Sequence, residues 1–129
     1  YYWCLNDPNA LTIWIALEKA NKKNGGIYYF KKSHLLGLLE HIPSHVPGSS
    51  QKLKFPLGMN HFKKTYPSLE PGDCLVHHSL IAHGSLKNDS SRSRVGVTLR
   101  YKTKKSYKDR FLKERYEREL KKQISLRIK

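Results

Sequence analysis

The stretch that decides the fold is residues 71–94, which read PGDCLVHHSLIAHGSLKNDSSRSR. A tight Pro-Gly-Asp turn leads into Cys74 to His78, an apolar run with the composition of a β-strand. His83 then opens a polar turn, and Arg94 follows eleven residues later. A histidine in a polar turn is usually a surface residue, and an arginine at the start of a strand is usually solvated. Their occurrence in one short run raises the question of a metal site.

Three further segments are predicted to be strands. Residues 10–17 read ALTIWIAL, a β-branched and aromatic run that we expect to be buried on both faces. Residues 27–30 follow an Asn-Gly-Gly turn, and we expect this strand to neighbour the first in one sheet. Along residues 94–101 the side chains alternate, which places them on two faces: Val95, Val97, Leu99 and Tyr101 on one, and Arg94, Gly96, Thr98 and Arg100 on the other.

The rest of the chain divides into a loop and a tail. Residues 33–69 hold four prolines and little periodicity, which predicts a long loop with a short helix around residues 35–41. Residues 105–128 lack Gly and Pro and repeat apolar side chains at helical spacing, which predicts a helix with a modest apolar stripe. Strands separated by turns, with one terminal helix, predict a mainly β fold, an antiparallel sandwich or jelly roll.

Composition limits the classes of function. The 129 residues suit one domain, and no apolar run approaches the ~20 residues of a membrane span. Cys4 and Cys74 lie far apart without a CxxC pair, which argues against a disulfide framework and suits a reducing, cytoplasmic compartment. The net charge is +15, but residues 102–129 alone hold 12 Lys or Arg and 4 Asp or Glu. The tail therefore carries most of any tendency to bind nucleic acid or an acidic surface, and its interspersed glutamates weaken that tendency.

The residues also resemble a known family. The run from Pro71 to Arg94 is similar to the phytanoyl-CoA dioxygenase family of iron(II)- and 2-oxoglutarate-dependent oxygenases, whose distal half has Pro-Gly-Asp, a His, and His-Gly-Ser-x-x-Asn-x-Ser with an Arg eleven residues after the metal histidine. Residues 9–34, NALTIWIALEKANKKNGGIYYFKKSH, resemble the family's Asn-Ala-Leu-Thr-x-Trp-x-Ala-Leu, Asn-Gly and Ser-His segments. The likeness covers roughly residues 2–101.

The resemblance implies a fold and a set of roles. The fold would be a double-stranded β-helix, the cupin-like jelly roll, present here as a partial barrel without its N-terminal part. His83 would be an iron ligand, Arg94 would pair with the far carboxylate of 2-oxoglutarate, and Ser85 would hydrogen-bond that carboxylate. Trp14 would pack against the co-substrate or the metal pocket. His78 matches a family histidine that is not a ligand, so a structural role follows for it.

The resemblance also implies an activity and its requirements. Iron(II), 2-oxoglutarate and O₂ would together hydroxylate a small organic substrate, with release of succinate and CO₂. The family's other two ligands, a His-x-Asp pair, have no counterpart in the sequence, and the alignment places them about two residues before Tyr1. The chain opens without a methionine, so we expect a fragment of a longer protein. Residues 1–104 would be the distal part of the dioxygenase domain, and residues 105–129 a basic helix packed on or extending from it.

Simpler interpretations stay open for several of these residues. Trp14 would serve equally as core, and Ser85 and Asn88 equally as members of a turn. A zinc site of Cys74, His77, His78 and His83 is conceivable from residue types, but adjacent histidines on a strand point to opposite faces. For the whole chain, the alternatives are a jelly roll that has lost catalysis and a binding module that uses the basic helix.

Overall fold

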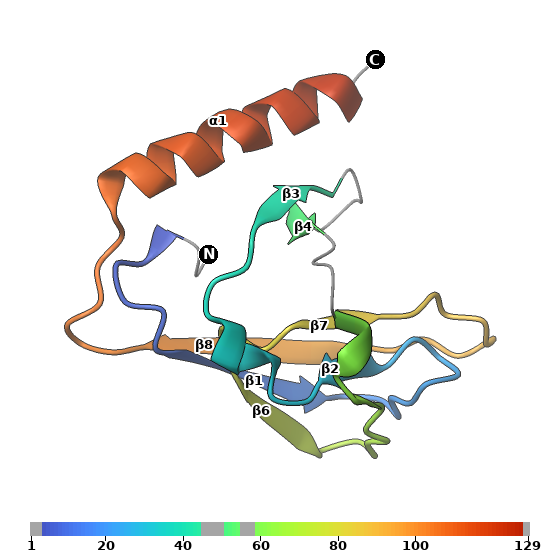
Figure 1. The fold of residues 1–129 in the computed structure, drawn as a ribbon. Coiled ribbons are helices and arrows are strands. Elements are labelled where there is room, and N and C mark those ends of the chain that lie inside the picture. The colour runs from blue at the N-terminus through green and yellow to red at the C-terminus, as the bar shows by residue number, and fades with distance from the viewer. Residues whose placement is uncertain (1–3, 45–50, 55–58, 128–129) are drawn as a thin grey trace.

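Two antiparallel sheets form the body of the protein, seen in a computed structural model that describes residues 4–44, 51–54 and 59–127. In the first sheet, β1 (Ala10–Ala16) lies between β6 (Cys74–His78) and β8 (Gly96–Lys102) (Figure 1). In the second, β2 (Ile27–Phe30) lies between β5 (Lys64–Thr65) and β7 (His83–Ser85). From β5 to β8 the chain alternates between the two sheets, as in a jelly roll, and the predicted mainly β fold is confirmed.

The strand register defines an inner face of the first sheet. Thr12 lies opposite both His77 and Arg100, and Trp14 lies opposite Leu75 and Thr98. Directly paired residues in antiparallel strands point to the same side, so these side chains share one face. The β1 members of that face are buried: Ala10, Thr12, Trp14 and Ala16. The inner face is thus the one that combines buried and polar side chains.

The opposite face of the same sheet is apolar and exposed. Ile13 lies between Val76 and Leu99, which are 60% and 40% exposed. Leu11, Val97 and Tyr101 extend this face along the strands and are exposed as well. The prediction that β1 is buried on both faces is therefore wrong for the described residues. The predicted division of side chains in β8 between two faces is confirmed.

The connection between β1 and β2 departs from the sequence prediction. The two strands belong to different sheets, so the expected pairing between them is wrong. The Asn-Gly-Gly segment does make a turn, in which Gly25 has a φ of 77° and the Gly26 N–H donates to the Asn21 carbonyl at 2.7 Å. That turn, however, joins Gly26 to Asn21 and does not pair β2 with β1. The strand after it, β2, belongs to the second sheet.

The long segment after β2 contains more structure than predicted. A 3-10 helix (η2, Ser33–Leu36), a hairpin of β3 (His41–Pro43) and β4 (Gln51–Leu53), and a second 3-10 helix (η3, Met59–His61) precede β5. The helix predicted for residues 35–41 is replaced by η2, which ends at Gly37 with a φ of 71°. A residue with positive φ ends a helix. This conformation is energetically costly for residues that have a Cβ atom, so glycine is favoured at the position.

The tail forms the predicted helix. α1 runs from Arg110 to Arg127, and the Asp109 carboxylate accepts a hydrogen bond from the Leu112 N–H at 2.9 Å, which caps its N-terminus. Figure 1 shows α1 on the side of β3, which it contacts, rather than against the first sheet. No helix in the described residues has both the length and the apolarity that crossing a membrane requires.

Candidate functional site

His83 and Ser85 sit on β7, a strand that the sequence presented as a turn. Their partners across β2 are Tyr29 and Ile27 respectively, so the four side chains share one side of the second sheet. The His83 Nδ1 lies 2.8 Å from the Ile81 carbonyl oxygen. A carbonyl only accepts, so Nδ1 carries the proton and Nε2 keeps a free lone pair. Metal-binding histidines are typically held in this way.

A buried serine fixes the approach to His83. Ser33 is fully buried, and its Oγ accepts a hydrogen bond from the Ala82 N–H at 2.8 Å. Ala82 is itself buried in a cluster with Phe30 and Met59. The residue before His83 is therefore anchored by both a hydrogen bond and apolar packing.

Arg94 lies over Trp14, where the inner face of the first sheet ends. The guanidinium carbon is 5.8 Å from the indole centroid, a cation–π arrangement. Gly96 makes room for the ring, because a Cβ there would lie 2.2 Å from Trp14 Cζ2. Arg94 is half-buried and has no acidic partner among the described residues. A half-buried guanidinium of this kind fits a carboxylate supplied by a ligand.

The Arg94 backbone is held from both sides by Glu18. The Glu18 carboxylate accepts the Ser93 hydroxyl at 2.7 and 2.8 Å and the Val95 N–H at 3.0 Å. The Val95 carbonyl in turn accepts the Leu17 N–H at 3.0 Å. Since Glu18 is occupied by the two neighbours of Arg94, it fixes the backbone of this arginine without pairing its charge.

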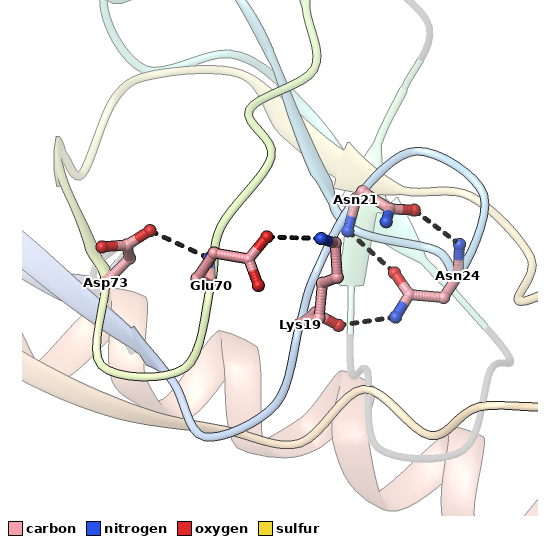
Figure 2. Close-up of polar contacts among 5 residues, drawn as sticks. All are labelled: Lys19, Asn21, Asn24, Glu70 and Asp73. Carbon is pink, nitrogen blue, oxygen red and sulfur yellow. Dashed lines mark hydrogen bonds and ion pairs between the residues drawn. The ribbon is translucent and has the colours of Figure 1, made fainter.

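Asn24 ties the β1–β2 connection to the same loop. Its side-chain amide donates to the Lys19 carbonyl at 2.6 Å and to the Ser93 carbonyl at 3.4 Å, and its oxygen accepts the Asn21 N–H at 2.8 Å. Figure 2 shows the bonds of Asn24 with Lys19 and Asn21 beside the ion pair of Lys19 with Glu70. Asn24 is 4% exposed, so its bonds are shielded from water.

The loop between β7 and Arg94 is shaped by Asn88. Its amide donates to the Arg92 carbonyl at 2.7 Å, and its oxygen accepts both the N–H and the hydroxyl of Ser90, at 3.0 and 2.8 Å. Asn88 therefore closes a turn between β7 and Arg94, as its residue type favours.

Tyr29 and His77 form a polar pair beside His83. The Tyr29 hydroxyl is 3.0 Å from His77 Nδ1, and the His77 and His83 ring centroids are 4.9 Å apart. Burial raises the pKa of Tyr29 to about 12. Burial, and to a lesser degree the His83 charge, lowers the pKa of His77 to about 4, so this imidazole is neutral at neutral pH.

His78 lies on the opposite side of β6 and has a structural role. Its Nε2 contacts the Asn9 side-chain oxygen at 3.3 Å, and its Nδ1 accepts the Leu80 N–H at 3.2 Å. Cys74, also on the outer face, is exposed, Cys4 is buried, and neither forms a disulfide. The four residues of the zinc alternative are thus divided between two faces of the sheet, and that alternative is wrong.

The ligand set for iron in the family's manner is incomplete within residues 1–129. Among the described residues, no group of three or more His, Cys, Asp or Glu side chains is placed to hold a metal ion. His83 supplies one free imidazole nitrogen, and the sequence contains no His-x-Asp. On the side of Arg94, Ile27, which pairs with Ser85 between β2 and β7, packs against the apolar cluster containing Trp14.

Sequence reasoning missed several residues that build this site. Glu18, Asn24 and Gly96 position Arg94, and Tyr29 and His77 line the space beside His83. For Asn24 the sequence predicts only a turn. Its buried bonds to the Lys19 and Ser93 carbonyls leave no local sequence pattern. The alternation of side chains along a strand does predict that His77 and His78 point to opposite faces of the sheet. It therefore indicates that one of the two histidines faces inward.

The fold is that of a jelly roll, with His83 on a strand of the second sheet and Arg94 just before β8 of the first. The chain belongs to the phytanoyl-CoA dioxygenase (PhyH) family, whose profile matches residues 1–96. Among curated proteins, none matches the chain.

Two solved proteins share the fold. The non-heme alpha-ketoglutarate-dependent epimerase SnoN from nogalamycin biosynthesis is 21% identical in sequence to this chain, with a TM-score of 0.64. The match covers 85% of this chain and 40% of the SnoN chain. SnoN has also been solved with Fe³⁺, alpha-ketoglutarate and nogalamycin RO. The non-heme monooxygenase ThoJ, in its apo form, is 18% identical with a TM-score of 0.66, covering 96% of this chain and 58% of its own. The chain thus spans about two fifths to three fifths of these relatives.

Proposed function

We propose that the protein is an iron(II)- and 2-oxoglutarate-dependent dioxygenase that hydroxylates a small organic substrate and releases succinate and CO₂. The observation that carries the proposal is Arg94, a half-buried guanidinium that stacks on Trp14 and has no acidic partner in the described part of the chain. Such a group is costly to hold out of water unless an anion completes it. A dicarboxylic co-substrate is the anion that the family uses.

The proposed roles are those that the resemblance to the family implies, and the geometry of Arg94 and His83 supports them. Arg94 would bind the far carboxylate of 2-oxoglutarate with two parallel hydrogen bonds, and the Ser85 hydroxyl would donate a third. Trp14 forms the apolar wall against which the carbon chain lies. His83 offers Nε2 to the metal, since its Nδ1 proton is committed to Ile81. Iron(II) with 2-oxoglutarate and O₂ supplies the oxidant, while the protein orients the co-substrate and excludes water.

The remaining assignments are also proposals. Residues 1–104 constitute the distal part of the dioxygenase domain, and residues 105–129 are a basic helix that extends from it. The proposed activity requires the family's His-x-Asp ligands, which residues 1–129 do not contain. The partners are small molecules, 2-oxoglutarate and O₂, rather than nucleic acid, because each glutamate on the described part of α1 is already paired with a lysine or arginine of the same helix and dilutes its positive field. The protein acts in the cytoplasm.

The first test measures the co-substrate and the metal separately. Calorimetric titration of the chain with 2-oxoglutarate should show binding that weakens roughly tenfold or more in Arg94→Ala, because charge-assisted bonds are worth about 1.5–3 kcal/mol. Arg92→Ala, which removes the same charge from the same loop, should change it less than about twofold. Iron(II) affinity should be unaffected by either change and reduced by His83→Ala.

The results distinguish the proposal from its rivals. Equal weakening by Arg92→Ala and Arg94→Ala would mean that net charge attracts the anion without a defined site. Adding the native upstream residues should then produce the visible charge-transfer band of the iron–2-oxoglutarate chelate. A lengthened protein that binds neither iron nor 2-oxoglutarate would contradict the proposal and favour a jelly roll that has lost catalysis.

A further inference from the structure

A pocket of about 500 Å³ lies where the connection between β1 and β2 meets the loop that precedes β8. Its lining includes Lys19 and Lys23 from the connection and Ser91 and Arg92 from the loop. We propose that this pocket binds a small molecule through a phosphate or pyrophosphate group. The inference is independent of the proposed function, because it uses neither iron nor the side chain of Arg94.

The pocket carries positive charge that the chain does not neutralise. Three of its lining side chains are cationic, and only Asp89 is acidic. Lys19 already belongs to an ion pair, and the Asp89 carboxylate lies 3.8 Å from the ammonium group of Lys87, which is outside the lining. Among the described residues, Lys23 and Arg92 have no acidic partner. Two positive charges therefore remain for a ligand.

Hydrogen bonds within the pocket wall use its acceptors and leave its donors free. The Asn21 side-chain oxygen accepts the Lys23 N–H at 2.9 Å, and the Asn24 side-chain oxygen accepts the Asn21 N–H at 2.8 Å (Figure 2). Within the described part of the chain, no hydrogen bond uses the side-chain donors of Lys23, Ser91 and Arg92. The Asn21 amide N–H groups are free in the same way. A wall of free donors without free acceptors fits an anion.

The kinds of donor favour phosphate over carboxylate. A phosphate monoester has three terminal oxygens and a charge of about −1.5 to −2, so it accepts bonds from an ammonium, a guanidinium, a hydroxyl and an amide together. A carboxylate has a single charge and two oxygens. The pocket volume of about 500 Å³ falls in the range of roughly 300–1,000 Å³ that is typical of small-molecule sites. We therefore expect the phosphate group to belong to a larger molecule.

The two walls of the pocket are joined to each other in the free protein. The Asp89 N–H donates to the Lys23 carbonyl at 3.4 Å, which links the loop to the connection. Gly25, with a φ of 77°, brings the same two segments into close contact, because a Cβ there would lie 2.7 Å from the Leu86 carbonyl oxygen. A pocket with fixed walls loses less conformational entropy when a ligand binds.

The experiment is a calorimetric titration of the chain with inorganic pyrophosphate. Lys23→Gln and Arg92→Ala should each weaken binding about fivefold or more, because each removes a charged donor. Ser91→Ala removes a donor without changing the charge and should weaken binding about threefold. Lys87→Gln is the matched control, since it removes one positive charge from the same loop at an 88% exposed side chain outside the lining. It should change the affinity less than about twofold.

The two arginines of the loop separate this inference from the proposed function. Arg94→Ala should leave pyrophosphate affinity within about twofold of the wild type and weaken 2-oxoglutarate binding, and Arg92→Ala should do the reverse. Equal weakening of pyrophosphate binding in Lys87→Gln and Arg92→Ala would overturn the inference, because it would show attraction by net charge alone. Displacement of pyrophosphate by equimolar 2-oxoglutarate, or no binding of pyrophosphate, would also overturn it.

A measurement on the wild type covers the case of a variant that does not fold. In NMR spectra recorded during the same titration, the backbone amide signals of residues 21–24 and 89–92 should shift first, because these residues line the pocket or adjoin its lining. Larger shifts in the basic helix α1, at residues 110–127, would overturn the inference and indicate that pyrophosphate binds that helix.

Discussion

At the scale of single residues, the most demanding contact is the one between Trp14 and β8. The indole lies where a side chain on Gly96 would be, and Arg94 covers its face. Aromatic rings supply large buried area, so the site's arginine is positioned by a core residue rather than by a salt bridge. Under the proposed function, the Trp14 position therefore links stability and co-substrate binding.

Gly96→Ala tests this link. The new Cβ would stand 2.2 Å from Trp14 Cζ2 and 2.9 Å from the Ile15 carbonyl oxygen, so the ring must move. We expect a loss of about 1–3 kcal/mol in the free energy of unfolding, as for other overpacked sites, together with a shift in tryptophan fluorescence. Chemical denaturation measures the first quantity.

A double-mutant cycle supplies the control for Gly96→Ala. In a Trp14→Leu background the same substitution should cost much less, because the clashing ring is gone. An equal cost in both backgrounds would show that the Ile15 backbone, and not the indole, excludes a side chain at this position.

At the scale of elements, the parts that position Arg94 come from distant segments. The turn after β1 contributes Glu18 and Asn24, and the loop after β7 contributes Asn88. The predicted strands at residues 27–30 and 74–78 are confirmed, because turn residues and apolar runs mark them locally. Strand β7 was missed, since His-Gly-Ser has no strand pattern and pairs with β2 only in the folded chain.

Asn24→Ala tests how the elements are joined. Removing the amide leaves the Lys19 carbonyl and the Asn21 N–H without their buried partners, which should lower the free energy of unfolding by about 1–3 kcal/mol. It should also weaken 2-oxoglutarate binding, because the loop carrying Arg94 loses an anchor. Denaturation and calorimetry together measure both effects.

An exposed asparagine provides the comparison for Asn24. Asn60 in η3 is exposed, so Asn60→Ala should change stability by less than about 0.5 kcal/mol. Loss of stability in Asn24→Ala with unchanged 2-oxoglutarate affinity would show that Asn24 supports the fold but not the position of Arg94.

At the scale of the whole molecule, the two faces of the first sheet differ in an unusual way. The inner face carries Thr12, His77 and Arg100, whereas the outer face carries exposed valine, leucine and tyrosine side chains. Contiguous exposed apolar surface of this kind is rare on an isolated soluble domain. The described residues therefore expose an apolar surface, which we expect to bind apolar molecules.

Substitution of the outer face tests this conclusion. Val76→Thr with Leu99→Thr should lower the fluorescence of a bound apolar dye such as anilinonaphthalene sulfonate by roughly half, since the two flank Ile13 at the centre of the face. Leu35→Thr, at a 74% exposed position in η2, should have little effect. Equal decreases in both variants would mean that the dye binds the chain nonspecifically.

The amino-acid sequence was enough to predict the mainly β class and the positions of four strands and the final helix. These depend on alternation and turn residues, which are local properties of one stretch of chain. The folded structure was needed to show which strands share a sheet, that Gly96 accommodates Trp14, and that Tyr29 and His77 lie beside His83. Those contacts join residues up to 92 positions apart, as in the pairing of Ala10 with Lys102, and their energies depend on packing that no local pattern encodes.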